Sequence, residues 1–125
     1  MSIVTLDHVN IRTPDLEPTK DFFTEILGLK AGARPSFPNR GYWLYAGGTP
    51  IVHLSEGDAE SRGGTGSFGH VAFRATGLAQ MRRTLTEHGV PFTEQVVPGR
   101  GEVQLFVREP SGVTVELQFS GTEAG

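Results

Sequence analysis

The first half of the chain alternates apolar and polar side chains in short runs, with one stretch of helical spacing between them. Residues 4–12 (VTLDHVNIR) show the period of two that is typical of a half-buried strand. The next segment opens at Thr13-Pro14-Asp15 and carries an apolar stripe at a spacing near 3.6 residues, which predicts a helix that ends at Gly28. Three strands should follow: a short one around Leu29 and two joined by a Gly47-Gly48 hairpin, at 41–46 and 49–56.

The second half repeats this order of elements. A glycine-rich and charged stretch at 57–66 has the composition of a linker. After it, the pattern predicts a strand at 67–75 and a helix at 78–88. Three further strands are expected at 91–97, 102–108 and 113–119, the last two joined by a turn at Glu109-Pro110-Ser111-Gly112.

The two halves also align residue by residue. Equivalent positions are 61 to 63 residues apart: DHV at 7–9 with GHV at 69–71, Gly28 with Gly89, and IVHL at 51–54 with TVEL at 114–117. A nearly constant offset indicates an internal duplication. We therefore predict an α+β fold of two paired βαβββ modules, at about 4–56 and 67–119. The modules are expected to form a curved mixed sheet around a concave cleft, with the helices on the outer face.

Composition limits the classes of protein to consider. The 125 residues have the length of one compact domain, 1–125. The absence of cysteine excludes a disulfide scaffold, a thiolate metal site and a cysteine nucleophile. A net charge of −3 does not favour nucleic acid or an anionic membrane, and no apolar run has the length of a membrane span or the form of a signal peptide. We expect a cytoplasmic protein that binds a small molecule.

Four residues that could bind a metal occupy equivalent positions of the two modules: His8 with His70, and His53 with Glu116. The strand period directs apolar neighbours such as Val9 toward the helices, so these four side chains should lie on the opposite, concave face. Three imidazoles and one carboxylate would form a site for a divalent metal. Ligands of this type suit Fe²⁺, Zn²⁺, Ni²⁺, Mn²⁺ or Co²⁺ and do not distinguish among them.

The rest of the concave face should line a substrate pocket. Trp43 and Tyr45 would supply an aromatic wall, as expected of a cleft for a small molecule. Arg40 and Arg100 flank glycine-rich turns. Their side chains would either close over an anionic group of the ligand or be exposed to solvent. By strand parity the predicted pocket residues are Asn10, Trp43, Tyr45, Arg74, Gln104, Phe106 and Arg108.

Several segments of the chain resemble the vicinal oxygen chelate superfamily, which includes glyoxalase I, bleomycin resistance proteins and extradiol dioxygenases. They are LDHVNIRTPDLEPTKDFFTEILGL, PIVHLSE, GHVAFRATGLAQMRRTLTEHGVPF and VREPSGVTVELQF. The resemblance implies paired βαβββ units with a metal held by the first and last strands of each unit. His8, His70 and Glu116 fall on the ligand positions of the family. His53 departs from the pattern, because glyoxalase I-like members carry a carboxylate there and epimerase-like members an amide.

The resemblance leaves three functions open. The first, which we favour, is a metal enzyme that chelates two adjacent oxygens of its substrate, as an extradiol-type dioxygenase does with Fe²⁺, with His53 as the acid–base group. The second is a glyoxalase-like lyase or epimerase-like isomerase, in which His53 is the fourth metal ligand. The third is a metal-free drug-binding resistance protein, although such proteins usually lack the histidine and glutamate set. The family also implies a homodimer. The sequence does not determine the substrate, the metal, a role for O₂, or whether one chain or two build the site.

Overall fold

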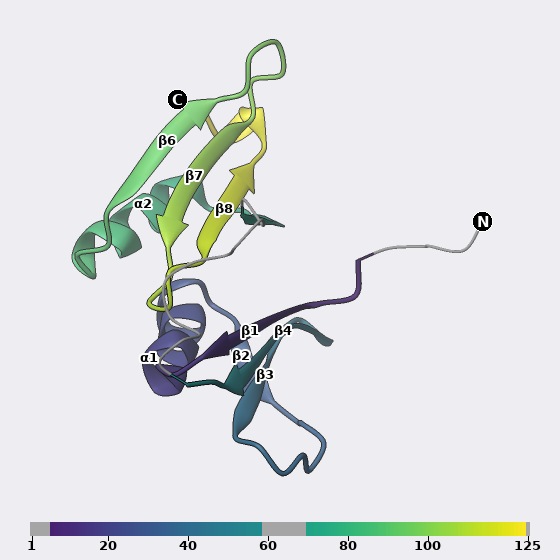
Figure 1. Cartoon of the computed structure of the whole chain (residues 1–125). Coiled ribbons are helices and arrows are strands. Elements are labelled where there is room, and N and C mark those ends of the chain that lie inside the picture. The colour runs from purple at the N-terminus through teal and green to yellow at the C-terminus, as the bar shows by residue number, and fades with distance from the viewer. Residues whose placement is uncertain (1–5, 59–69, 125) are drawn as a thin grey trace. The chain divides into compact units, whose positions relative to one another are not determined.

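A computed structural model describes residues 6–58 and 70–124 (Figure 1). The chain divides into two compact units, Met1–Arg62 and Gly63–Gly125. Each unit has its own four-stranded mixed sheet and the βαβββ order of elements. The predicted α+β fold of two similar modules is therefore confirmed. The linker predicted at 57–66 and the first residues of the strand predicted at 67–75 lie largely outside the described residues.

The sheet of the first unit has the strand order β1-β4-β3-β2. Strand β1 (Val9–Thr13) runs parallel to β4 (Thr49–Glu56), and β3 (Gly41–Ala46) pairs antiparallel with β4 and with β2 (Lys30–Gly32). The strand predicted at 4–12 begins only at Val9, because the parallel ladder with β4 starts at the Val9–Val52 pair. Residues 4 and 5 lie outside the described part of the chain.

The helix of the first unit changes its hydrogen-bonding pattern halfway. It begins as α1 (Leu16–Asp21) and continues as a π-helix, η1 (Phe22–Ile26). At its end, Gly28 has a φ of +84° and the Leu29 amide donates to the Phe23 carbonyl at 2.9 Å. In the second unit the corresponding bond joins Val90 to Leu85 at 2.8 Å and spans one residue fewer. The π-helix therefore accommodates one extra residue, which explains why the offset between the modules falls from 62 to 61 at this point.

The second unit repeats the same topology, with the strand order β5-β8-β7-β6. Its strands are β5 (Val71–Arg74), β6 (Phe92–Val96), β7 (Val103–Arg108) and β8 (Thr114–Phe119). Helix α2 (Leu78–Glu87) lies against one face of this sheet, and a short 3₁₀ helix, η3 (Gly121–Glu123), follows β8 (Figure 1). As in the first unit, the first strand is parallel to the last, and the other two ladders are antiparallel.

Strand parity separates the two faces of each sheet as predicted. The core face consists of side chains that are at most 6% exposed: Ile11, Leu44, Val52 and Leu54 in the first unit, and Val103, Leu105, Val107, Val115, Leu117 and Phe119 in the second. The helices add Phe22, Phe23, Leu78 and Leu85 to these cores. The opposite faces are left to the polar and aromatic residues from which a site can be built. Among the described helices, none is long and apolar enough to cross a membrane.

Candidate functional site

In the first unit the structure brings His8 and His53 together. Asn10 on β1, two residues after His8, is the register partner of His53 on β4. On the other side of β4, His53 pairs with Trp43 on β3. The imidazole rings of His8 and His53 are stacked with centroids 3.7 Å apart and an interplanar angle of 13°. The indole of Trp43 stacks on His53 with centroids 4.1 Å apart and an angle of 12°. The ring of His53 is thus held between two other planar rings.

Each imidazole of this pair has one nitrogen that is hydrogen-bonded to an oxygen. The His53 Nε2 lies 3.1 Å from the Pro50 carbonyl oxygen, and the His8 Nδ1 lies 2.7 Å from the Asp7 Oδ1. Because a carbonyl or carboxylate oxygen only accepts, these nitrogens carry hydrogens. In the neutral form of each ring, this leaves Nδ1 of His53 and Nε2 of His8 as acceptors. Metal-binding histidines show this pattern, in which the second ring nitrogen donates to an oxygen.

The protonation state of His53 suits the same role. Burial lowers the pKa of His53 below its ordinary value of 6.5, and the nearby charge of His8 lowers it further. The hydrogen bond to the Pro50 carbonyl opposes this change in pKa but does not cancel it. His53 is therefore neutral at pH 7, which is the form that binds a metal or accepts a proton.

In the second unit the structure brings His70 to Glu116. The His70 Nε2 lies 3.1 Å from the Glu116 Oε1, and the Gln104 Nε2 donates to the Glu116 Oε2 at 3.0 Å. The side chain of Glu116 is only 6% exposed. A buried carboxylate is costly without partners, and these two contacts supply them. The ring of Phe106 meets the edge of His70 with centroids 6.1 Å apart.

The two pairs are equivalent under the internal duplication. In each unit, a histidine just before the first strand contacts a residue of the last strand, at the position predicted from the offset. Among the residues that the structure describes, no three histidine, aspartate or glutamate side chains form one group that could hold a metal ion. Ligation of a single metal by His8, His53, His70 and Glu116 stays a prediction.

The predicted pocket residues of the first unit have different roles. Asn10 is exposed, and its Oδ1 accepts a hydrogen bond from the Ser55 hydroxyl at 3.3 Å. Trp43 stacks on His53, as described above. Tyr45 donates its hydroxyl hydrogen to the Ala33 carbonyl at 2.6 Å, and its ring covers Gly32, where a Cβ would lie 2.8 Å from a ring carbon. Tyr45 therefore fixes the end of β2.

Three of the four remaining predicted pocket residues line two separate pockets of the second unit. Arg74 lines an open pocket of about 590 Å³, together with Arg100, Glu102 and the residues after β8. Phe106 and Arg108 line a second pocket of about 400 Å³. Gln104 lies between the candidate site and β6, because it holds Glu116 and accepts a hydrogen bond from the Gln95 amide at 2.7 Å.

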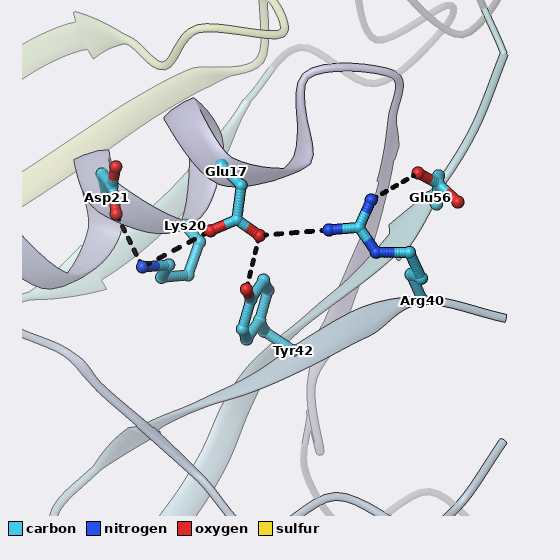
Figure 2. A network of polar contacts seen from close by, with 6 residues as sticks. All are labelled: Glu17, Lys20, Asp21, Arg40, Tyr42 and Glu56. Atoms are coloured by element: carbon cyan, nitrogen blue, oxygen red, sulfur yellow. Dashed lines mark hydrogen bonds and ion pairs between the residues drawn. The ribbon is translucent and has the colours of Figure 1, made fainter.

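A polar network that the sequence pattern did not reveal connects α1 to the strands of the first unit (Figure 2). Arg40 donates to the carboxylates of Glu56 at 3.0 Å and Glu17 at 3.5 Å, and the Tyr42 hydroxyl also donates to Glu17. This hydrogen bond raises the pKa of Tyr42, and burial adds to the effect. Arg40 thus has carboxylate partners of its own, as Arg100 has in Glu102 at 2.8 Å. The network consists of Glu17, Lys20, Asp21, Arg40, Tyr42 and Glu56.

Comparison with known proteins gives a consistent picture. Residues 5–117 match the family described as the Glyoxalase/Bleomycin resistance protein/Dioxygenase superfamily. The chain is 32% identical over 120 residues to lactoylglutathione lyase GLX1 of Arabidopsis thaliana, covering 88% of this chain and 42% of that relative. It therefore spans less than half the length of that protein.

Two further proteins match over most of their own length. Lactoylglutathione lyase of Escherichia coli O157:H7 is 27% identical over 119 residues, which cover 88% of each chain. Among solved structures, the fosfomycin resistance protein FosX from Listeria monocytogenes has the same fold, with a TM-score of 0.74 and 16% identity over 94% of both chains.

Proposed function

The chain belongs to the glyoxalase/bleomycin resistance protein/dioxygenase superfamily, and from that premise we propose that it is a divalent-metal-dependent enzyme of the lyase or isomerase type. Its substrate would be a small molecule with two adjacent oxygens. The observation that carries this proposal is the His70–Glu116 pair, a buried carboxylate in contact with an imidazole at 3.1 Å. The similarity to lactoylglutathione lyases over most of the chain supports lyase-type chemistry.

The donor groups of these residues fit a divalent metal. We propose that His8, His70 and Glu116 bind it, whether the two pairs come from one chain or from two copies. Histidine nitrogens and a carboxylate oxygen suit Fe²⁺, Zn²⁺, Ni²⁺, Mn²⁺ and Co²⁺, and the tautomers of His8 and His53 leave one nitrogen of each ring as an acceptor. When bound, such a metal stabilises negative charge that develops on a substrate oxygen.

The chain's own residues would move the proton. His53 is neutral near pH 7 because burial and the charge of His8 lower its pKa, and its Nδ1 can accept a hydrogen. In the alternative, His53 is the fourth ligand and a displaced ligand would be the base. Glu116 is the candidate, since its Oε1 faces His70 while Gln104 holds its Oε2. Replacement of His53 by alanine separates the two roles: loss of turnover with full metal content indicates proton transfer, and loss of metal indicates ligation.

Metal analysis of the variant Glu116→Gln tests the ligand assignment. The glutamine keeps the size of the side chain and removes the negative charge, so we expect the metal content of protein purified without added metal to fall to background. The control is Glu87→Gln, an exposed carboxylate on α2, which should keep the metal content of the parent protein. Circular dichroism should show an unchanged fold in both variants. Unchanged metal content in Glu116→Gln would refute the assignment.

A dioxygenase is the second candidate, because two histidines and one carboxylate also form the ligand set of non-haem iron oxygenases. Turnover of hemithioacetals or of other 2-oxo compounds by the nickel- or zinc-loaded protein supports the lyase or isomerase. Consumption of O₂ with catechols by the iron-loaded protein supports the oxygenase instead. Protein that binds no metal but binds a drug tightly would support the third function, a resistance protein. A homodimer and a cytoplasmic location stay predictions, of which sedimentation analysis checks the first.

A further inference from the structure

The pocket of about 400 Å³ in the second unit lies where β6 begins, β7 ends and β8 begins. This volume is within the range of pockets that hold small molecules. Four of its seven residues are apolar, two are threonines and one is an arginine. The lining residues are Pro91, Phe92, Thr93, Phe106, Val107, Arg108 and Thr114.

This pocket adjoins the His70–Glu116 pair. Phe106 is the register partner of Glu116, so the two side chains project from the same face of the sheet. Arg108 pairs with Thr114, two residues before Glu116, and is on that face as well. The ring of Phe106 lines the pocket and at the same time meets the edge of His70. A ligand in the pocket would therefore lie beside the carboxylate and the imidazole of the candidate site.

The charge of the pocket is positive and unopposed. Arg108 is exposed, and no carboxylate lines the pocket. In the part of the chain that the structure describes, the guanidinium of Arg108 has no hydrogen bond or ion pair. Arg82 shows the contrast, because two hydrogen bonds join it to Glu94. A free guanidinium beside the ring of Phe106 suits a ligand with an apolar body and one carboxylate.

We propose that this pocket binds the side chain of a small organic acid, with its apolar group against Phe106 and its carboxylate on Arg108. As a statement about the substrate, this rests on the proposed function. It assigns to the enzyme an aryl- or alkyl-substituted 2-oxo or 2-hydroxy acid. A glutathione conjugate fits less well, since glutathione carries an ammonium group besides two carboxylates, and the pocket has no acidic residue to receive it.

Binding of 3-phenylpropionate to the metal-free protein tests the proposal. This acid has a phenyl ring and one carboxylate but no adjacent pair of oxygens, and 3-phenylpropanamide is its neutral counterpart. We expect the acid to shift the backbone amide signals of Thr93, Phe106 and Arg108 in ¹H–¹⁵N spectra. The amide should bind at least about tenfold more weakly, because a hydrogen bond between two charged groups is stronger than one to a neutral amide.

Variants show whether Arg108 and Phe106 are responsible. Arg108→Gln should remove the difference in affinity between acid and amide, and Phe106→Ala should weaken both ligands. The control is Arg83→Ala, an exposed arginine on α2 that should leave both affinities unchanged. The spectra themselves report whether each variant is folded. The proposal is overturned if 3-phenylpropionate causes no shifts, if acid and amide bind equally to the parent protein, or if Arg83→Ala weakens binding as much as Arg108→Gln does.

Failure of this proposal can be told from failure of the proposed function. The binding experiment uses metal-free protein, so it does not depend on the ligand assignment. Binding of the acid together with unchanged metal content in Glu116→Gln would keep the pocket and reject the metal site. Loss of metal in Glu116→Gln without binding of the acid would keep the metal site and reject the pocket.

Discussion

The imidazole ring of His53 lies parallel to that of His8, with centroids 3.7 Å apart, and this contact affects how both the site and the first unit respond to pH. Burial and the charge of His8 lower the pKa of His53. Since the folded state then binds a proton less readily than the unfolded state, protonation of His53 destabilises the fold. The contribution of His53 to the stability of the fold is unfavourable at low pH and disappears as the pH rises past 6.5, the ordinary pKa of histidine.

We predict that His53 in metal-free protein titrates below pH 6.5 and that His8→Ala moves its midpoint upward. The variant removes the charge of His8 and exposes the ring of His53, and each change favours the protonated form. Long-range ¹H–¹⁵N spectra of the imidazoles over a pH series measure the midpoint. Lys30→Ala on β2 is the control and should leave it unchanged. An unchanged or lower midpoint in His8→Ala would contradict the prediction.

A second prediction concerns the carboxylate of Glu123, which caps α2. Its Oε1 accepts hydrogen bonds from the backbone amides of Gly77 at 3.0 Å and Leu78 at 2.9 Å. A negative charge at the N-terminus of α2 also interacts favourably with the helix dipole. We expect Glu123→Ala to lower the free energy of unfolding by about 1–2 kcal/mol, as loss of a helix cap does. Urea unfolding followed by circular dichroism measures the change.

The control for this cap is another carboxylate near the opposite end of the same helix. Glu87 is exposed, and in the described part of the chain it has no hydrogen-bond or ion-pair partner. Glu87→Ala should change the free energy of unfolding by less than about 0.5 kcal/mol. Equal effects of the two substitutions would show that Glu123 does not stabilise α2.

A third prediction compares two glycines of the first unit. A Cβ at Gly41 would lie 2.2 Å from the Leu54 carbonyl oxygen, which belongs to the neighbouring strand and cannot move aside. We expect Gly41→Ala to lower the free energy of unfolding by about 2–3 kcal/mol. At Gly48 a Cβ would meet nothing within 4 Å, so Gly48→Ala should have an effect near zero. Thermal or urea unfolding would disprove this prediction if it gave equal values.

The fourth prediction is a pH dependence at the contact of α2 with β6. Arg82 donates from Nε to the Glu94 Oε1 at 2.9 Å and from a terminal nitrogen to Oε2 at 2.6 Å. These bonds lower the pKa of Glu94 from its ordinary value of 4.5. The stabilisation is therefore complete above pH 4.5 and is lost as the pH falls through the lower pKa of the folded state. Glu94→Gln should be slightly less stable than the parent protein at pH 7 and equally stable in strong acid.

Urea unfolding at a series of pH values measures this difference. Glu25→Gln is the matched control, because Glu25 is an exposed carboxylate on η1 without a described partner. It should match the parent protein at pH 7. A difference between Glu94→Gln and the parent protein that persists at low pH would mean that the charge of Glu94 is not its source.

The sequence predicted which residues occupy the candidate site but not all of the contacts between them. The offset between the modules identified His8 and His70, and His53 and Glu116, as equivalent positions on the first and last strands of the repeated unit. The structure shows that the contacts within each unit join His8 to His53 and His70 to Glu116. The sequence did not predict that Gln104 holds Glu116 or that Trp43 stacks on His53. These contacts depend on the register of antiparallel ladders, for which the local pattern contains no signal.

By itself, the sequence determined the duplicated α+β architecture and the core face of each strand, and it predicted which residues ligate a metal. Side-chain periodicity and the spacing of the repeat are properties of the linear chain, so they can be read without coordinates. Only the tertiary structure decided that an extra residue turns part of the first helix into η1, that Glu123 caps α2, and that Arg40 is held by Glu17 and Glu56. Each of these features depends on how a segment packs against its neighbours, and this packing exists only once the strands and helices have come together.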